Sequence, residues 1–306
     1  MTSKSMQLSH EATTSLWRSF IKSQFRTKPR HAPADTNLSG KVAIVTGGSS
    51  GLGYHCSRHL LSLQLSCLIL AVRSLEKGES IAKELRVDYP SAKIDVWPLE
   101  MTSYPSIQDF CRRAETNLPR LDITILNAGV ILPEFGLCST GHERVMQVNY
   151  LSTFLLAILM LPISKTKAPS GHPGRLTIVS SGVALWAKFP NRDKRPLLAS
   201  FDNTKVQAWD PVERYWSSKM LGHLFFVRML EYLNADDVIV NLVEPGMCKG
   251  SGLHRDISGG AGVFLDVYKS LTGRKSEDGA WTYVDAAVVK GKESHGSFCM
   301  DWEIHP

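Results

Sequence analysis

Short apolar runs alternate with longer amphipathic stretches along most of this 306-residue chain. The apolar runs have the length of strands and occupy residues 42–46, 65–72, 92–99, 121–126, 175–180 and 238–243. The stretches between them space their apolar positions as helices do, first up to about residue 63 and then over about 75–87, 103–117, 139–161 and 212–233. Strands that alternate with helices predict parallel pairing through right-handed crossovers.

The alternation continues without an internal repeat or a second linker, which predicts one domain over residues 38–306. We therefore expect an α/β fold with a doubly wound parallel sheet of the Rossmann-like kind. Ligands of such sheets bind beyond the carboxyl ends of the strands. The residues that follow those ends are the first candidates for a functional site.

A glycine-rich turn follows the first predicted strand and opens a helix. Its candidate binding residues are Gly47, Ser49, Ser50, Gly51, Leu52 and Gly53. Glycines let a backbone approach phosphates closely, and a helix N-terminus supplies amides and a positive dipole end. A tight turn would also use glycines, but the position between strand and helix favours a diphosphate cradle. The spacing, Gly-x-x-x-Gly-x-Gly, differs from the common dinucleotide fingerprint.

The end of the second strand indicates which dinucleotide would bind. Sites that prefer NAD usually have an acidic residue there for the ribose hydroxyls, whereas a basic residue accommodates a 2′-phosphate. This chain has Arg73 and Ser74, with no acid before Glu76. The position favours NADPH/NADP as cofactor over a merely solvated arginine.

Two tyrosines are followed four residues later by a lysine: Tyr215 by Lys219, and Tyr89 by Lys93. Pro90 disfavours a helix at Tyr89, so that pair is expected to straddle a helix end and a strand start. No breaker separates Tyr215 from Lys219, so the two can share a helix face. An ammonium beside a phenol lowers the pKa of the phenol, which would make Tyr215 a proton donor near neutral pH.

Composition limits the remaining possibilities. The six cysteines show neither C-x-x-C nor metal-ligand spacing, which favours reduced thiols, a cytoplasmic location and no metal site. No apolar run reaches about 18 residues, and the longest, residues 151–163, is expected to form a buried helix. The N-terminus shows no secretory signal pattern.

The net charge of +6 belongs mostly to an N-terminal arm, residues 1–37. The first 34 residues contain six cations and one anion, whereas the remaining residues add only +1. Because the folded part is nearly neutral, a nucleic-acid partner is not expected. Apolar positions 16, 17, 20, 21 and 25 form a helical stripe among basic residues. Such an arm could contact a membrane surface; docking on its own domain, or fraying, is the favoured alternative.

Several motifs occur together and in order: residues 46–53, Asn127-Ala128-Gly129, Asn149, the serines at 180 and 181, Tyr215-x-x-x-Lys219, and Pro245-Gly246. In this respect the chain resembles the short-chain dehydrogenase/reductases over about residues 38–300. It looks most similar to the retinol-dehydrogenase-like branch and to fungal reductases of secondary metabolism. Residues 16–28, 71–77 and 291–296 strengthen the second comparison.

The resemblance implies roles for matching residues. Tyr215 would be the catalytic acid/base, Lys219 would lower its pKa and hold the nicotinamide ribose, and Ser181 would hydrogen-bond the substrate oxygen. Asn149 would kink its helix and hold a water in a proton relay, while Asn127 would brace the sheet. Pro245 and Gly246 would shape the nicotinamide pocket. Ser181 is preferred over Ser180 because it directly precedes a small-residue loop, and only one of two successive strand residues can face the cleft.

Three positions depart from the family pattern. Glu100 stands where an aspartate often contacts adenine. Gly250 takes the slot of a Thr or Ser that binds the carboxamide, so Ser251 would have to substitute. Ser181 and Tyr215 are 34 residues apart, and the segment between them, about 185–212, contains aromatic residues and prolines. It is either a wall of the substrate pocket or a surface excursion; long aromatic loops beside active sites favour the wall.

Two functions remain from different classes. The first is an NADPH-dependent ketoreductase or alcohol dehydrogenase acting on a bulky hydrophobic secondary metabolite, in a chain that could form a homo-oligomer. The second is a non-redox member, either a nucleotide-binding sensor or scaffold, or an isomerase or cyclase that reuses the pocket. The proton-transfer set Ser181, Tyr215, Lys219 and Asn149 favours the first function.

Overall fold

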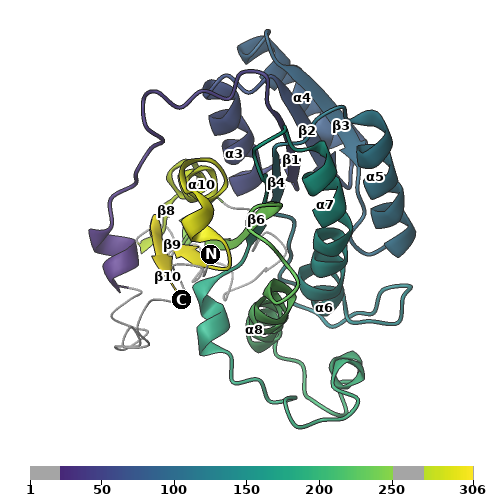
Figure 1. Ribbon diagram of the computed structural model, residues 1–306. Coiled ribbons are helices and arrows are strands. Elements are labelled where there is room, and N and C mark those ends of the chain that lie inside the picture. The colour runs from purple at the N-terminus through teal and green to yellow at the C-terminus, as the bar shows by residue number, and fades with distance from the viewer. Residues whose placement is uncertain (1–20, 251–271, 306) are drawn as a thin grey trace.

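The computed structural model describes residues 21–250 and 272–305. Its centre is an eight-stranded sheet in the order β10-β9-β6-β5-β4-β1-β2-β3, in which only β10 runs antiparallel to its neighbour (Figure 1). The strands are β1 Val42–Thr46, β2 Cys67–Val72, β3 Lys93–Pro98, β4 Ile123–Leu126, β5 Gly174–Val179, β6 Val238–Glu244, β9 Phe298–Met300 and β10 Glu303–His305. A short parallel pair, β7 Cys248–Lys249 and β8 Arg274–Lys275, lies outside this sheet.

Helices cover both faces of the sheet. One face packs against α5 Tyr104–Asn117, α7 Thr153–Lys167 and α8 Pro211–Leu230. The other packs against α3 Gly51–Ser62, α4 Leu75–Asp88 and α10 Ser276–Val284. Short helical segments complete the described fold: η2 Lys22–Arg26, α6 Arg144–Met146, η3 Gln147–Ser152, η4 Gly182–Trp186, η5 Leu198–Asp202, η6 Asp285–Val289 and η7 Lys292–Ser294.

The predicted doubly wound α/β fold is therefore confirmed. Each of the six predicted strands is present and parallel, with ends that differ from expectation by at most two residues. The predicted Tyr89–Lys93 arrangement is also confirmed, because Tyr89 is the C-cap of α4 and Lys93 begins β3.

One helix begins later than predicted. The helix expected from residue 139 starts at Arg144, because a turn comes first and Glu143 caps the helix N-terminus. The Glu143 carboxylate accepts hydrogen bonds from the backbone N–H groups of Val145 and Met146. The continuous helical stretch Arg144–Lys167 is long and apolar enough to cross a membrane, the one such stretch among the described residues. Of its most apolar 18-residue window, 61% is buried inside the protein, as a core helix requires.

The N-terminal arm was expected either to contact a membrane or to lie on its own domain. The described part of the arm, from residue 21 onward, lies on its own domain, with η2 beside β8, β9 and β10 (Figure 1). Ser23 on this segment is buried and donates to Asp301 at 2.8 Å. Most of the expected amphipathic stripe, positions 16, 17 and 20, lies outside the described residues.

Candidate active site

The glycine-rich turn between β1 and α3 forms an open backbone cradle. Gly47 and Gly51 adopt positive φ angles of 66° and 54°, which favour glycine. A Cβ atom added to Gly53 would lie 2.5 Å from the Gly47 carbonyl oxygen. The turn thus requires glycine at these positions, and it presents the N-terminus of α3 to any ligand beyond the edge of the sheet.

Asn127 connects the ends of β4 and β1. Its side-chain amide donates to the carbonyl oxygen of Thr46 at 2.8 Å, and its backbone N–H donates to the Thr46 hydroxyl at 2.9 Å. The phenol of Tyr283, on α10, donates to Asn127 Oδ1 at 3.3 Å. Asn127 therefore links the ends of β4 and β1 to α10, in keeping with the bracing role expected for it. Thr46 was recognised only as part of the motif 46–53, with no role for its side chain, and Tyr283 was not identified from the sequence.

Arg73 and Glu100 follow the ends of β2 and β3, at the same edge of the sheet as the cradle. The Arg73 side chain is exposed, and the Ser74 hydroxyl accepts from the Lys77 backbone N–H as the cap of α4. Glu100 Oε1 accepts hydrogen bonds from the backbone N–H and the hydroxyl of Thr102, at 2.9 and 2.8 Å. Glu100 is the residue expected to contact adenine, and one of its carboxylate oxygens is thus already hydrogen-bonded within a local turn.

Tyr215 and Lys219 lie one turn apart on α8, as predicted, and Ser181 approaches them from the end of β5. The hydroxyls of Tyr215 and Ser181 are hydrogen-bonded to each other. Lys219 Nζ lies 5.8 Å from the centre of the Tyr215 ring and donates to the Val179 carbonyl oxygen at 3.0 Å. The end of β5 and the helix α8 therefore bring a phenol, a hydroxyl and an ammonium into one cluster.

The expected lowering of the Tyr215 pKa by Lys219 is wrong for this structure. Burial, followed by the nearby carboxyl group of Glu244, raises the pKa of Tyr215, and the hydrogen bond from Ser181 opposes this only in part. Burial lowers the pKa of Lys219 to about 8. Desolvation outweighs the attraction between the two groups because the lysine ammonium is directed to Val179 rather than to the phenol.

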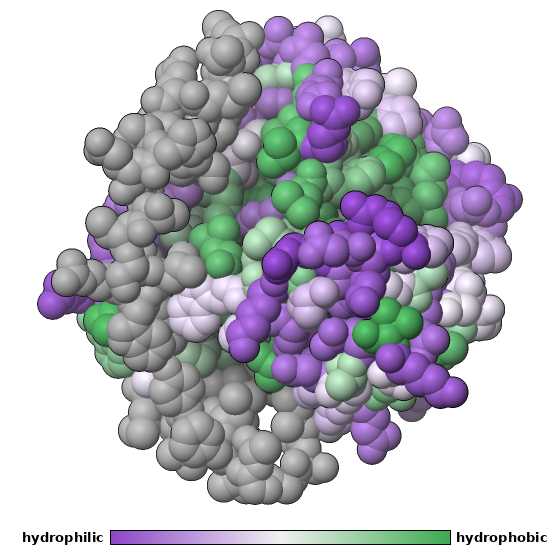
Figure 2. Space-filling model, turned by 90° about the horizontal axis from the view of Figure 1, so that it is seen from below, coloured by the Kyte–Doolittle hydropathy of each residue, from purple (hydrophilic) through white to green (hydrophobic). Residues whose placement is uncertain are grey.

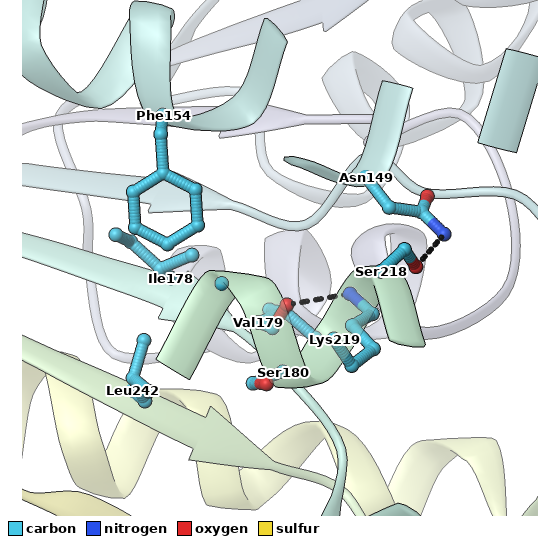
Figure 3. Close-up of a pocket in the computed structure, with 9 residues that line it drawn as sticks. Asn149, Phe154, Ile178, Val179, Ser180, Ser218, Lys219 and Leu242 are labelled. Carbon is cyan, nitrogen blue, oxygen red and sulfur yellow. Dashed lines mark hydrogen bonds between the residues drawn. The ribbon is translucent and has the colours of Figure 1, made fainter. Parts of the chain in front are cut away.

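Asn149 lies in the π-helical stretch Gln147–Ser152, directly before α7. Its amide donates to the Val130 carbonyl oxygen at 2.8 Å. It also donates to the Ser218 hydroxyl at 3.1 Å (Figure 3). A small cavity of about 10 Å³ lies among Asn149, Ser218, Lys219 and the end of β5. Its lining is mixed, because apolar side chains such as Phe154, Ile178 and Leu242 face the same space as the polar ones. A space of this size has room for roughly one water at most.

Ser180 and Ser181 point to different partners, as strand alternation requires. Ser180 is buried and its hydroxyl lies 2.7 Å from Nε2 of His223 on α8, whereas Ser181 contacts Tyr215. Burial lowers the pKa of His223 to about 4, so its imidazole is neutral near pH 7. His223 was not predicted from the sequence, although its spacing of four from Lys219 on one helix indicates that the two residues share a face.

Glu244, the last residue of β6, is a further site residue that the sequence analysis missed. Its carboxylate accepts a hydrogen bond from the backbone N–H of Gly182, the residue after Ser181. Burial raises the pKa of this carboxyl to about 7. An acid immediately before Pro245 and Gly246, at the carboxyl end of a central strand, was the signal that could have identified it.

Pro245 and Gly246 form the turn after β6, close to the glycine-rich cradle. A Cβ added to Gly279 of α10 would lie 3.2 Å from Leu52 Cδ2 of the cradle and 3.3 Å from the Pro245 carbonyl oxygen. The same helix thus packs against both turns, which places them side by side at the edge of the sheet. Ser251, the expected carboxamide contact, lies outside the described residues.

The segment 185–212 is anchored on residues 133–143 by a few contacts, although most of its residues are exposed. Trp209 Nε1 donates to the Pro133 carbonyl oxygen at 2.8 Å, and the Phe189 and Phe201 rings stack. At its end, Arg214 pairs with buried Glu143 at 3.5 Å. Large apolar side chains on or beside it remain exposed, namely Leu137, Leu185, Val206 and Val212. Figure 2 shows the underside of the molecule, where apolar residues gather in a hollow framed by hydrophilic ones.

The described residues contain no group of His, Cys, Asp and Glu that could hold a metal ion. The six cysteines are free thiols.

Comparison with known proteins identifies close relatives. A family model described as short chain dehydrogenase matches residues 41–190. Short chain dehydrogenase/reductase mfmJ of Annulohypoxylon moriforme is 59% identical over 288 residues, covering 94% of this chain and 83% of that protein. Short chain dehydrogenase opdN of Penicillium oxalicum is 44% identical over 289 residues, covering 90% of this chain and 92% of that protein.

Solved structures share the fold at lower identity. L-sorbose reductase from Gluconobacter frateurii, complexed with NADPH and L-sorbose, superposes with a TM-score of 0.65 at 17% identity. It covers 86% of this chain and 95% of its own. The RhlG/NADP active-site complex from Pseudomonas aeruginosa has a TM-score of 0.58 at 23% identity, covering 80% of this chain and 88% of its own.

Proposed function

This chain belongs to the short-chain dehydrogenase/reductase family and is an oxidoreductase, and on that premise we propose that it is an NADPH-dependent ketoreductase or alcohol dehydrogenase. We propose as its substrate a bulky hydrophobic carbonyl compound or alcohol of fungal secondary metabolism. The observation that supports the proposal most strongly is the assembly of Ser181, Tyr215, Lys219 and Asn149 around one small region at the ends of β5 and α8. A protein that only bound a nucleotide would not need this proton-transfer set.

The residues present fit a dinucleotide. The cradle of Gly47, Gly51 and Gly53 leaves the backbone bare where a diphosphate would approach, and α3 begins there. Exposed Arg73, at the end of β2, has the charge and position to bind a 2′-phosphate. The NADP complexes among the solved relatives are in keeping with this preference.

The chemistry of the remaining groups follows from their positions. When bound, NADPH supplies the hydride that reduces a carbonyl carbon. Because the Ser181 and Tyr215 hydroxyls reach one another, both can reach one substrate oxygen, where negative charge develops. Ser181 donates a hydrogen bond to that oxygen and Tyr215 transfers a proton to it. Oxidation of an alcohol uses the same groups in reverse, with Tyr215 as the base.

Lys219 and Asn149 support the return of the proton to Tyr215. With its pKa at about 8, Lys219 is mostly charged at neutral pH, yet can release a proton without a large cost. The cavity among Lys219, Ser218 and Asn149 has room for about one water, as the expected proton relay requires.

The hydrophobic substrate is inferred from the segment 185–212. It packs against the core through Phe201, which is buried with Met146 and Leu221, and leaves Leu185 and Val206 exposed. Apolar walls near a polar reaction centre are typical of pockets for apolar small molecules.

Two further proposals concern the surroundings of the enzyme. The free cysteines support a reducing compartment such as the cytoplasm.

A homo-oligomer is the second of these proposals. Ile158 on α7 and Leu224 and Val227 on α8 are exposed, and they form apolar surface that a homo-oligomer would cover.

The proposal is tested by NADPH fluorescence in the presence of a panel of hydrophobic ketones and aldehydes. Oxidation of NADPH with at least one compound, together with tighter binding of NADPH than NADH, is expected. Binding without oxidation across a broad panel would favour the non-redox alternative, in which the same pocket senses a nucleotide or catalyses isomerisation.

A further inference from the structure

The N-terminal segment lies against the turn that follows β6, more than 200 residues later in the chain. Gln24 faces the backbone of Met247. When the nitrogen and oxygen of the Gln24 amide are assigned to suit their neighbours, the nitrogen donates to the Met247 carbonyl oxygen and the oxygen accepts from the Met247 N–H, both at 3.1 Å. This two-point pairing resembles the contact of a neighbouring strand. A single side chain thus pairs with both backbone groups of one turn residue.

Gly246 fits closely into this arrangement. Its φ angle is +72°, and an added Cβ would lie 2.9 Å from a terminal atom of the Gln24 amide and 3.1 Å from Arg274 Cζ. Gln24 and Arg274 therefore pack directly against Gly246, which is partly buried, as is Met247. A side chain added at Gly246 would have to displace one of them.

Arg274 links the turn to two other segments. Its backbone N–H donates to the Met247 carbonyl oxygen at 3.0 Å. Its guanidinium donates to the Ser23 carbonyl oxygen at 2.7 Å and to Asp301 Oδ1 at 2.8 Å. The Ser23 hydroxyl also donates to Asp301 Oδ1 at 2.8 Å. The side chains of Arg274 and Asp301 are only 7% and 15% exposed, so these charge-assisted bonds are largely shielded from water.

The other side of the turn faces the functional groups. Pro245 neighbours Leu52 of the glycine-rich cradle across Gly279, and Glu244 neighbours Tyr215. The turn thus lies between the diphosphate cradle and the proton donor, where the nicotinamide half of a dinucleotide would lie. A displacement of the turn would alter that half of the site and leave the adenine half, at Arg73, unchanged.

We propose that Ser23 and Gln24 are positioning residues that hold the turn 245–247 in the geometry needed to bind the nicotinamide end of the cofactor. The inference rests on the proposed function, because it assumes a bound dinucleotide. It assigns to the basic N-terminal arm a role within its own active site. Arg274 and Asp301 form an ion pair and both hydrogen-bond to Ser23, which fixes its position. Gln24 is the next residue along the chain and is therefore held against the backbone of Met247.

The test compares two probes on each variant: NADPH, and adenosine 2′,5′-bisphosphate, which lacks the nicotinamide end. Gln24→Ala removes both bonds to Met247 and is expected to raise the Kd of NADPH on the order of 10-fold. Ser23→Ala is expected to change it in the same direction. The Kd of adenosine 2′,5′-bisphosphate should change less than about 2-fold, because a lost hydrogen bond acts locally.

Arg30→Ala is the matched control, since Arg30 belongs to the same arm but makes only an exposed 3.4 Å pair with Glu303. It should change neither Kd. Melting temperatures show whether each variant is folded at the assay temperature. If Gln24→Ala is unfolded, Gln24→Glu replaces it, because Glu keeps the acceptor for the Met247 N–H and loses the donor.

Equal weakening of both probes, or no weakening of NADPH, overturns the positioning role. A wild type that prefers NADH to NADPH overturns the proposed cofactor alone, and the comparison is then made with NADH and ADP. A wild type that binds neither dinucleotide overturns both proposals.

Discussion

The Glu244 carboxylate accepts a hydrogen bond from the backbone N–H of Gly182, directly after Ser181. The two residues pack so closely that a Cβ on Gly182 would lie 2.6 Å from Glu244 Oε2. This contact joins the end of β6 to the segment that presents Ser181. It also places a half-buried acid, with its pKa raised to about 7 by desolvation, beside the proton donor Tyr215.

Glu244→Gln is expected to flatten the pH dependence of carbonyl reduction near neutrality. In the wild type, kcat/KM should fall as pH rises through about 7, because ionised Glu244 opposes the negative charge that develops on the substrate oxygen. The groups facing Glu244 are Tyr215, Arg274 and Asp301, and none of them is altered in this variant. A pH profile of kcat/KM measures the effect. Glu231→Gln, on the exposed Arg228 pair, is the control that should keep the wild-type profile.

The raised pKa of Glu244 also predicts that the stability of the protein changes with pH. Because its folded pKa lies above the ordinary 4.5, the folded state binds the proton more tightly than the unfolded state. The wild type should therefore lose stability between about pH 4.5 and 7 relative to Glu244→Gln. Urea unfolding of both proteins at pH 5 and pH 7.5 measures this difference; a constant difference would contradict the raised pKa.

Tyr215→Phe is expected to lower kcat by about 10²- to 10⁴-fold, because it removes the proton donor and leaves the ring in place. NADPH binding should persist within a few fold. Tyr89→Phe is a matched control, since Tyr89 is also followed four residues later by a lysine but caps a helix far from Ser181. Steady-state kinetics with the best ketone of the panel compare the two. Full turnover by Tyr215→Phe would exclude its proposed role.

Arg73→Ala is expected to raise the Kd of NADPH about 10- to 100-fold and to leave the Kd of NADH nearly unchanged, because only the 2′-phosphate would lose a charge-assisted partner. Titrations that follow NADPH and NADH fluorescence separate the two effects. Arg112→Ala removes an exposed cation on α5 of the same charge and should alter neither value. Unchanged NADPH affinity in Arg73→Ala would end the assignment of Arg73.

Gly53→Ala is expected to abolish dinucleotide binding and to destabilise the fold by about 1–3 kcal/mol, because its Cβ would clash with Gly47 and Asn127. Gly40→Ala separates the two effects. Its φ of +75° makes alanine strained, but nothing lies within 4 Å of an added Cβ. We expect about 1 kcal/mol of destabilisation there with unchanged NADPH affinity. Thermal melts and NADPH titrations of both variants provide the measurements.

Local patterns in the sequence were sufficient for the framework of the protein. The spacing of apolar residues predicts all six parallel strands, because strand and helix periods are properties of neighbouring residues. The meeting of the cradle, Ser181 and Tyr215 at one edge follows from parallel pairing itself. The late start of the helix at Arg144 did not follow, because it depends on how the Glu143 carboxylate caps its own backbone.

The sequence by itself therefore determined the α/β framework, the identity of the glycine-rich turn and the shared helix face of Tyr215 and Lys219. Only the tertiary structure decided that burial raises the pKa of Tyr215, that Glu244 lies beside it, and that Ser23 reaches Asp301, 278 residues away. A pKa depends on desolvation and on charges across space. Contacts between distant segments depend on how the whole chain packs, so residue spacing along one element contains neither kind of information.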